Sequence, residues 1–181
     1  MLFRSLSGGA VYTDDGNVVE FDVTPRLSVL QEVLEESPHK VIVFVPYRHT
    51  LSLIKAHLDK HHVSSEVISG SVSANDRAAI FNRFQTTDDP EVLLIQPQSA
   101  SHGVTLTRAD TVVFWSPVMS VETYLQCIAR IDRVGQKNSM TVIHLQGSEV
   151  ERRMYTMLQN KVDMHERLVD LYREEMEESN G

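Results

Sequence analysis

The chain contains 181 residues, of which 41% are hydrophobic and 23% charged, and its formal net charge is −8 at pH 7. This composition is typical of a single globular domain with a substantial core, and no apolar run is long enough to span a membrane. The single cysteine, Cys127, excludes an intramolecular disulfide, and the acidic balance argues against a general nucleic-acid binder, so we expect any polyanion site to be a local patch.

Residues 1–38 carry the signals of a β-hairpin followed by a helix. Residues 10–13 and 18–22 are predicted to form short strands, and the Asp-Asp-Gly-Asn sequence between them is typical of a tight hairpin turn. Thr24 is predicted to be the N-cap of the helix, with Pro25 at its first position. We expect this segment to pack on the core of the chain that follows.

Residues 39–148 alternate between apolar strands and amphipathic helices, which indicates a mostly parallel sheet covered on both faces. The predicted strands are residues 41–45, 65–68, 92–95, 111–115 and 141–145. The predicted helices are residues 51–61, 75–84 and 120–135. We therefore expect an α/β fold of three layers with about five strands in the sheet. Residues 149–181 are predicted to form a long helix that ends in a frayed acidic tail.

The predicted helix over residues 120–135 is the most informative element. Ser120 is a good N-cap and Gly135 a typical stop. Between them, the i, i+4, i+7 spacing would place Gln126, Arg130 and Arg133 on one stripe. Guanidinium groups are planar and permanently charged, so their natural targets are phosphate and carboxylate groups. The alternative is that both arginines complement the helix dipole and are otherwise solvated.

Two polar loops are predicted at the carboxyl ends of the strands, where ligands bind in such folds. These loops are residues 68–73 and 96–108. The second loop turns at Gly103 and offers hydroxyl groups from Ser101, Thr105 and Thr107. Hydroxyl and backbone N–H groups near a glycine turn suit the phosphates of nucleic acid, which they bind without reading sequence. The alternative is an ordinary connection whose hydroxyl groups bind its own backbone.

Three segments together resemble the second RecA-like lobe, or helicase C-terminal domain, of the SWI/SNF-type branch of superfamily-two helicase-like ATPases. Residues 103–112 match the pattern G-x-x-L-T-x-A-D-x-V, and residues 126–136 match Q-x-x-x-R-x-x-R-x-G-Q. The third segment contains Gly70, Ser71, Arg77 and Phe84. The matches occur in the family's order from about residue 40 to 145. The N-terminal hairpin is similar to phage and bacterial members.

The resemblance implies a RecA-like domain that is half of a DNA-stimulated, ATP-hydrolysing helicase or translocase. In that family ATP and Mg are held mainly by an N-terminal RecA-like lobe, either in the same polypeptide or in trans. The implied catalytic residues are Gln126, Arg130 and Arg133. The implied nucleotide contacts are Gly103, Asp132 and Gln136. The implied nucleic-acid contacts are Gly70, Ser71, Ser101, Thr105 and Thr107.

The second implied partner is DNA, expected to be duplex, and the resemblance implies neither a membrane nor a metal ligand in this chain. We expect a monomer in the cytoplasm of a bacterium or a phage-infected host. The chain has no G-x-x-x-x-G-K-[ST] loop and no D-E-x-H box, so we expect it to bind ATP poorly by itself. The family's D-W-N-P is replaced by Trp-Ser-Pro-Val at 115–118, so the contact of that asparagine is not carried over.

Other interpretations were weighed against the motor lobe. A catalytically silent RecA-like module for docking or nucleic-acid binding has no need for an arginine pair, so the intact motif favours the motor. A free-standing nucleotide-binding enzyme would need a glycine-rich fingerprint after its first strand, which is absent. His57, His61 and His62 have a spacing that suits zinc, but no acidic or cysteine partner stands nearby in the sequence.

Overall fold

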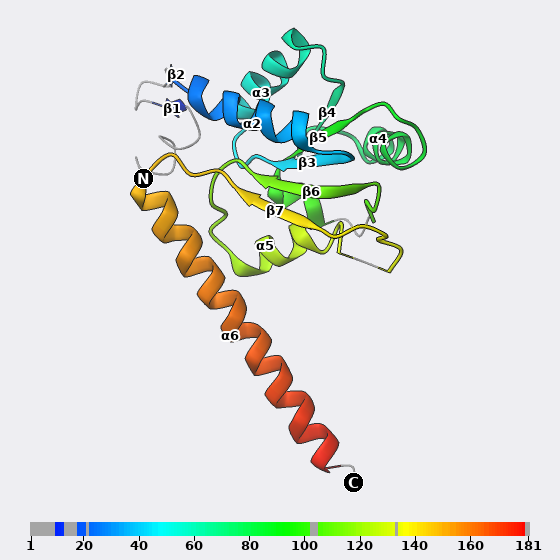
Figure 1. Cartoon of the computed structure of the whole chain (residues 1–181), viewed down its shortest axis with the longest axis vertical. Helices are drawn as coiled ribbons and strands as arrows, with labels where there is room; N and C mark the ends of the chain where they lie inside the picture. Colours follow the sequence, from blue (N-terminus) through cyan, green and yellow to red (C-terminus); the bar gives the residue numbers. More distant parts are fainter. Residues whose placement is uncertain (1–9, 13–17, 21, 102–104, 133, 180–181) are drawn as a thin grey trace.

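The computed structural model describes residues 10–12, 18–20, 22–101, 105–132 and 134–179. Its centre is a five-stranded parallel sheet in the order β4-β5-β3-β6-β7 (Figure 1). The strands are β3 (Lys40–Phe44), β4 (Ser65–Ile68), β5 (Val92–Ile95), β6 (Ala109–Phe114) and β7 (Thr141–His144). A separate antiparallel pair consists of β1 (Ala10–Tyr12) and β2 (Val18–Glu20). The predicted parallel sheet is confirmed, with strand ends shifted by a residue or two.

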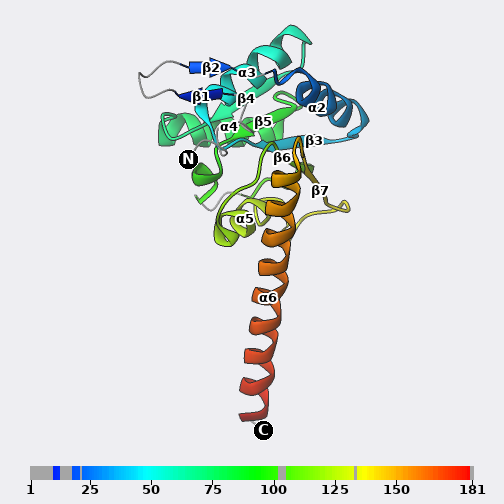
Figure 2. The same cartoon turned by 90° about the vertical axis from the view of Figure 1, so that its left-hand side faces the viewer.

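Helices cover both faces of this sheet (Figures 1 and 2). One face packs against α2 (Thr24–Glu36) and α3 (Arg48–Lys60). The other packs against α4 (Ala74–Thr86), α5 (Val121–Ile128) and the first part of α6 (Glu149–Ser179). A short 3-10 helix, η1 (Pro97–Ser101), follows β5. The predicted three-layer α/β fold is therefore confirmed.

The strands alternate their side chains between two cores. In β3, Val41 and Val43 belong to the core beneath α2 and α3, whereas Ile42 and Phe44 belong to the core beneath α4 and α5. All four side chains are almost completely buried. This is why the strand is apolar at every position from Val41 to Phe44, since a sheet covered on both faces has no solvent-facing side.

Capping serines begin two of the helices as predicted. The Ser73 hydroxyl accepts a hydrogen bond from the Asp76 N–H at 3.1 Å, and the Ser120 hydroxyl accepts one from the Thr123 N–H at 3.3 Å. The prediction that Thr24 is an N-cap is wrong by one residue. Val23 occupies that position, because the Val23 carbonyl already accepts the first helical hydrogen bond.

Helix α5 ends earlier than predicted, at Ile128 instead of near residue 135. The N–H groups of Arg130 and Ile131 bond to carbonyls three residues back, at 3.3 and 3.0 Å, so the chain tightens. The Arg130 carbonyl then accepts a hydrogen bond from the Leu106 N–H at 2.7 Å, and the Ile131 side chain is fully buried. Burial of Ile131 and this bond to a neighbouring segment are favoured over another turn of α5, so the predicted helix does not extend through residues 129–132.

Helix α6 extends well beyond the body of the domain (Figures 1 and 2). Tyr155, Leu158 and Val162, in its first half, are buried. The prediction of a frayed tail is wrong as far as Ser179, where the helix ends. Good helix formers such as Glu, Met, Arg and Leu make up this segment, which favours a continuous helix. None of the helices within the described residues has the length and apolar character needed to cross a membrane.

Candidate nucleotide and nucleic-acid sites

Arg130 lies in the turn directly after α5 and is buried. Its Nε donates a hydrogen bond to the carbonyl oxygen of Gln126 at 3.2 Å. Gln126 is half-buried, and its Nε2 donates to the Glu122 carboxylate at 3.2 Å. The structure therefore brings together two of the three predicted catalytic residues. The third, Arg133, lies outside the described residues.

Gln136 binds the protein itself with both ends of its amide. Its Nε2 donates to the carbonyl oxygen of Ala109 at 2.8 Å, and its Oε1 accepts from the N–H groups of Lys137 and Asn138 at 3.0 and 3.1 Å. Gly135, just before it, has a φ of 108°, a backbone conformation that favours glycine. In this structure the Gln136 amide is thus bonded within the lobe. Its predicted contact with a nucleotide stays a prediction.

Among the described cavities, Asp132 and Gln136 line two different ones. Asp132 is exposed and lines a groove of about 560 Å³ between α5 and α6, together with Leu125 and Ile128. The third predicted nucleotide contact, Gly103, lies outside the described residues. The predicted grouping of these residues around a nucleotide stays a prediction.

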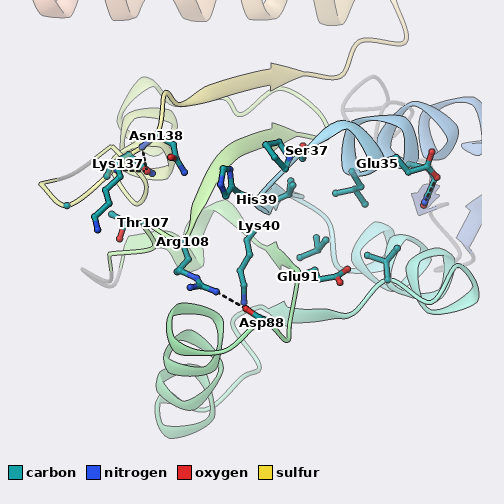
Figure 3. Close-up of a pocket in the computed structure, with 18 residues that line it drawn as sticks. Glu35, Ser37, His39, Lys40, Asp88, Glu91, Thr107, Arg108, Lys137 and Asn138 are labelled. Atoms are coloured by element: carbon teal, nitrogen blue, oxygen red, sulfur yellow. Dashed lines mark hydrogen bonds and ion pairs between the residues drawn. The ribbon is translucent and has the colours of Figure 1, made fainter.

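A larger cavity of about 870 Å³ lies at the amino ends of β3, β5 and β6 (Figure 3). Arg108 points toward Asp88, and their side chains form an ion pair at 3.0 Å. The buried Lys40 donates from Nζ to the carbonyl oxygens of Thr87 and Pro90 at 2.6 and 2.7 Å. Burial lowers the pKa of Lys40. Two of the cations that line this cavity are thus already bound by partners within the domain.

Thr107 also lies at the amino ends of the strands, whereas the 96–108 loop was predicted to lie at their carboxyl ends. Its Oγ1 accepts a long hydrogen bond from Gln85 Nε2 at 3.5 Å, and it lines the 870 Å³ cavity. The loop leaves the carboxyl end of β5 but has to enter β6 at its amino end, because the two strands are parallel members of one sheet. Thr105 is half-buried. Ser101 is the last residue of η1, and its side chain is outside the described part.

Gly70 and Ser71 lie at the carboxyl end of β4, as predicted. The Gly70 N–H donates to Gln96 Oε1 at 3.3 Å, and Gln96 Nε2 donates to the Pro46 carbonyl at 3.4 Å. One glutamine amide thereby joins the carboxyl ends of β4, β5 and β3. The Ser71 hydroxyl lies 2.8 Å from that of Ser69. Gly70 and Ser71 therefore lie at the carboxyl ends of the strands, whereas Thr107 lies at the amino ends.

Two basic residues of α3 beside Ser71 were missed by the sequence analysis. Arg48 and Lys55 line an open pocket of about 490 Å³ together with Ser71. Arg48 is exposed, and Lys55 is paired with Asp59. The position of Arg48, directly after the first strand of the sheet, was an available signal, because loops at carboxyl ends of parallel strands form ligand sites. We call Arg48, Lys55, Gly70 and Ser71 the carboxyl-edge patch.

The structure also describes Cys127 and the histidines near the end of α3, the two other candidates from the sequence. Cys127 is fully buried, which confirms its interpretation as a packing residue, and burial raises the pKa of its thiol to about 12. The rings of His57 and His61 lie 4.4 Å apart, and burial lowers the pKa of His57. Within the described part of the chain, no cluster of three or more His, Cys, Asp or Glu side chains is placed to hold a metal ion.

The fold and these segments define a class of protein, the RecA-like lobe that follows the ATP-holding lobe in helicase-like ATPases. The sequence model of the helicase conserved C-terminal domain matches residues 25–135, so the chain belongs to that family. The matched range includes the sheet from β3 to β6, the carboxyl-edge patch, and the turn after α5.

The curated relatives place the chain in the SWI/SNF-type branch. It is 32% identical over 149 residues to a SWI/SNF-related matrix-associated actin-dependent regulator of chromatin subfamily A-like protein 1 homolog of Caenorhabditis elegans, covering 78% of this chain and 22% of the relative. It is 27% identical over 146 residues to the CHD3-type chromatin-remodeling factor CHR7 of Arabidopsis thaliana, covering 78% and 12% respectively. The chain thus spans less than a quarter of either relative. Its similarity to phage and bacterial members stays a prediction.

Solved structures share the fold. The C-terminal part of the Fun30 ATPase domain superposes with a TM-score of 0.71 at 18% identity, covering 77% of this chain and 48% of that one. The C-terminal domain of the DEAD-box protein Dbp5 superposes with a TM-score of 0.64 at 18% identity, covering 75% and 77%. These similarities confirm the predicted RecA-like architecture.

Proposed function

We propose that the chain is the second motor lobe of a DNA-stimulated, ATP-dependent translocase or helicase of the SWI/SNF type. It works with an N-terminal RecA-like lobe that holds ATP and Mg, supplied in the same polypeptide or by another chain. In this proposal, residues 1–38 and 149–181 flank a catalytic lobe of residues 39–148, and the lobe is a monomer inside a cell. The relatives' names refer to chromatin and its remodelling, which supports DNA as the track.

The turn after α5 carries this proposal. It contains Arg130 and, by sequence, Arg133, and it is joined to the segment before β6 by the 2.7 Å hydrogen bond between Leu106 and Arg130. A guanidinium held in place stabilises the charge that develops on a transferred phosphoryl group without reorganising. Because the phosphate loop and magnesium ligands belong to the other lobe, this turn supplies only the second half of the site.

The carboxyl-edge patch is the proposed contact to the phosphates of DNA. Gly70 has open space around its Cα, and Arg48 is exposed beside Ser71. Hydroxyl, backbone and guanidinium groups bind phosphates independently of base sequence. Such contacts suit a motor that moves along DNA, since reading a sequence would hold it at one place.

A catalytically silent docking module is the second candidate function, and the burial of Arg130 favours it. The Arg130 side chain bonds within the lobe to the Gln126 carbonyl, which is a structural use of that residue. A silent lobe would need Arg130 for its fold but would have no use for Arg133. The two arginines therefore separate the two functions in an experiment.

The isolated chain is expected to show no saturable ATP hydrolysis. The reason is the lack of a phosphate-binding loop and an acidic magnesium box in this sequence. Phosphate release should be measured with and without Mg and DNA, and compared with a preparation of the same chain that carries Arg133→Ala. Metal-dependent turnover that saturates with ATP in the unaltered chain and is lost in the Arg133→Ala preparation would contradict the proposed division of labour between the lobes.

The carboxyl-edge patch is expected to control DNA affinity. Arg48→Ala should weaken binding to duplex DNA equally for all sequences and should reduce the slope of log affinity against log salt by about one unit. Ser71→Ala should weaken binding less, because it removes a neutral contact. Arg153→Ala is the matched control, since Arg153 is an exposed arginine that is paired with Glu149 on α6. If Arg153→Ala weakens binding as much as Arg48→Ala does, the patch is misplaced.

A further inference from the structure

The turn after α5 is joined at one end to the segment before β6 and at the other end to the first residue of β6. At the first end, the Leu106 N–H donates to the Arg130 carbonyl at 2.7 Å. At the second end, the Gln136 amide donates to the Ala109 carbonyl at 2.8 Å. The two hydrogen bonds join the same two parts of the chain. Their partners are three residues apart in one part, Leu106 and Ala109, and six residues apart in the other, Arg130 and Gln136. Between the two bonds, the sequence places Arg133.

The second of these bonds depends on a side chain, and its full set of contacts needs a group that both donates and accepts. Nε2 of Gln136 must donate to a carbonyl, while its Oε1 must accept from the N–H groups of Lys137 and Asn138 at 3.0 and 3.1 Å. Gly135, with its φ of 108°, provides the reversal of the chain before this amide. A carboxylate accepts but does not donate, and an alanine does neither.

We propose that Gln136 is a positioning residue that holds the arginine-bearing turn in register with β6, and that it acts on ATP turnover through the arginines without touching the nucleotide. This inference rests on the proposed function, because it needs an arginine of the turn to act on ATP. It replaces the expected nucleotide contact of Gln136 with a mechanical one. Misplacing a catalytic group by about 1 Å is enough to cost on the order of a hundredfold in rate.

The contacts at the start of β6 support this inference independently. Side chains outside the turn also hold the residues at this start in place. The Asp110 carboxylate is buried and paired with His39 Nδ1 at 2.5 Å. Gln85 of α4 accepts from the Arg108 N–H at 3.1 Å. A strand end that is fixed by side chains from α4 and from the residue before β3 is a rigid point, so the turn that is bonded to it is positioned by it.

The test uses the protein with both lobes and measures steady-state ATP hydrolysis at saturating DNA. Gln136→Ala and Gln136→Glu should each lower kcat by about tenfold to a hundredfold and leave KM for ATP within about twofold of the original value. The glutamate variant is the sharper one, because it keeps the side-chain shape and the acceptor and loses only the donor to Ala109. Gln31→Ala is the matched control: it removes a glutamine amide that donates to Glu35 within α2, on the other face of the sheet, and should keep kcat.

Three outcomes would overturn the inference. A raised KM with unchanged kcat would make Gln136 a nucleotide contact, and unchanged kinetics with a lower melting temperature would make it purely structural. A kcat that falls equally in Gln31→Ala would show that the loss is not specific to the bond between the turn and β6. Arg133→Ala in the same protein keeps the proposed function separate: if it abolishes turnover while Gln136→Glu is normal, only the positioning role fails.

Discussion

Replacing Arg133 with alanine in a protein that contains both lobes should lower ATP turnover by about a thousandfold, which corresponds to about 4 kcal/mol of barrier. The charge on the transferred phosphoryl group is spread over its oxygens, and a fixed guanidinium stabilises it in the transition state. ATP affinity should change little, because the other lobe holds the nucleotide. DNA affinity should also be retained, since the carboxyl-edge patch is intact. Steady-state kinetics and DNA titrations on one preparation measure all three quantities.

Two further variants test whether the guanidinium of Arg133 itself is required for turnover. Arg133→Lys should recover little turnover, because an ammonium is a point charge and does not reproduce the planar fork of a guanidinium. Arg130→Ala should lower both turnover and the melting temperature, because Arg130 is buried and bonded to Gln126. If Arg133→Ala retains normal turnover, the motor assignment of this residue is refuted and the silent docking module becomes the better explanation.

The sheet could be predicted because each of its strands has a local signal. The apolar runs within β3, β5 and β6 are short, continuous and separated by helical periodicity, and buried parallel strands require this pattern. Helix starts at Ser73 and Ser120 were also predictable, since a capping serine acts on an N–H group only three residues away. Signals of this kind need no knowledge of the rest of the fold.

The end of α5 depends on contacts between distant segments, which local patterns do not contain. Arg130 has helical spacing to Gln126, but the bond from Leu106 and the burial of Ile131 end the helix first. Thr107 and Gly70 were predicted to lie near each other because both belong to loops that follow strands. The loop that contains Thr107, however, runs from the carboxyl end of β5 to the amino end of β6. Its place follows from its position just before β6 in a parallel sheet, at the end of the loop and not at its start.

The candidate sites were predictable to different degrees for the same reason. Gly70 and Ser71 directly follow a strand, so their place at its carboxyl end could be inferred. Gln136 was singled out by its motif, but its contacts with Ala109 and the following N–H groups depend on how the turn meets β6. The motif therefore indicated a candidate residue, whereas the structure was needed to propose what that residue does.

The largest effect on stability is expected at Arg26, which joins α2, β6 and α6. Its Nη2 pairs with the Glu151 carboxylate at 2.7 Å, and its Nη1 donates to the Trp115 carbonyl at 2.5 Å. The side chains of Arg26 and Glu151 are only 13% and 3% exposed. Glu151 also accepts from the Gly147 N–H at 2.6 Å, so the pair holds the start of α6 against the sheet.

Arg26→Met should lower the free energy of unfolding of the 181-residue chain by about 3–5 kcal/mol, because it leaves the carboxylate of Glu151 buried without its cation. Arg26→Met combined with Glu151→Gln should recover much of this loss, since the neutral amide can still accept from Gly147 and leaves no unpaired charge. Arg152→Ala breaks an exposed pair on the same helix and should leave stability nearly unchanged. Urea unfolding of all four proteins measures these values. If the double variant is no more stable than Arg26→Met, the loss comes from the packing of Arg26 on the Trp115 ring, at 5.5 Å, and not from the stranded charge.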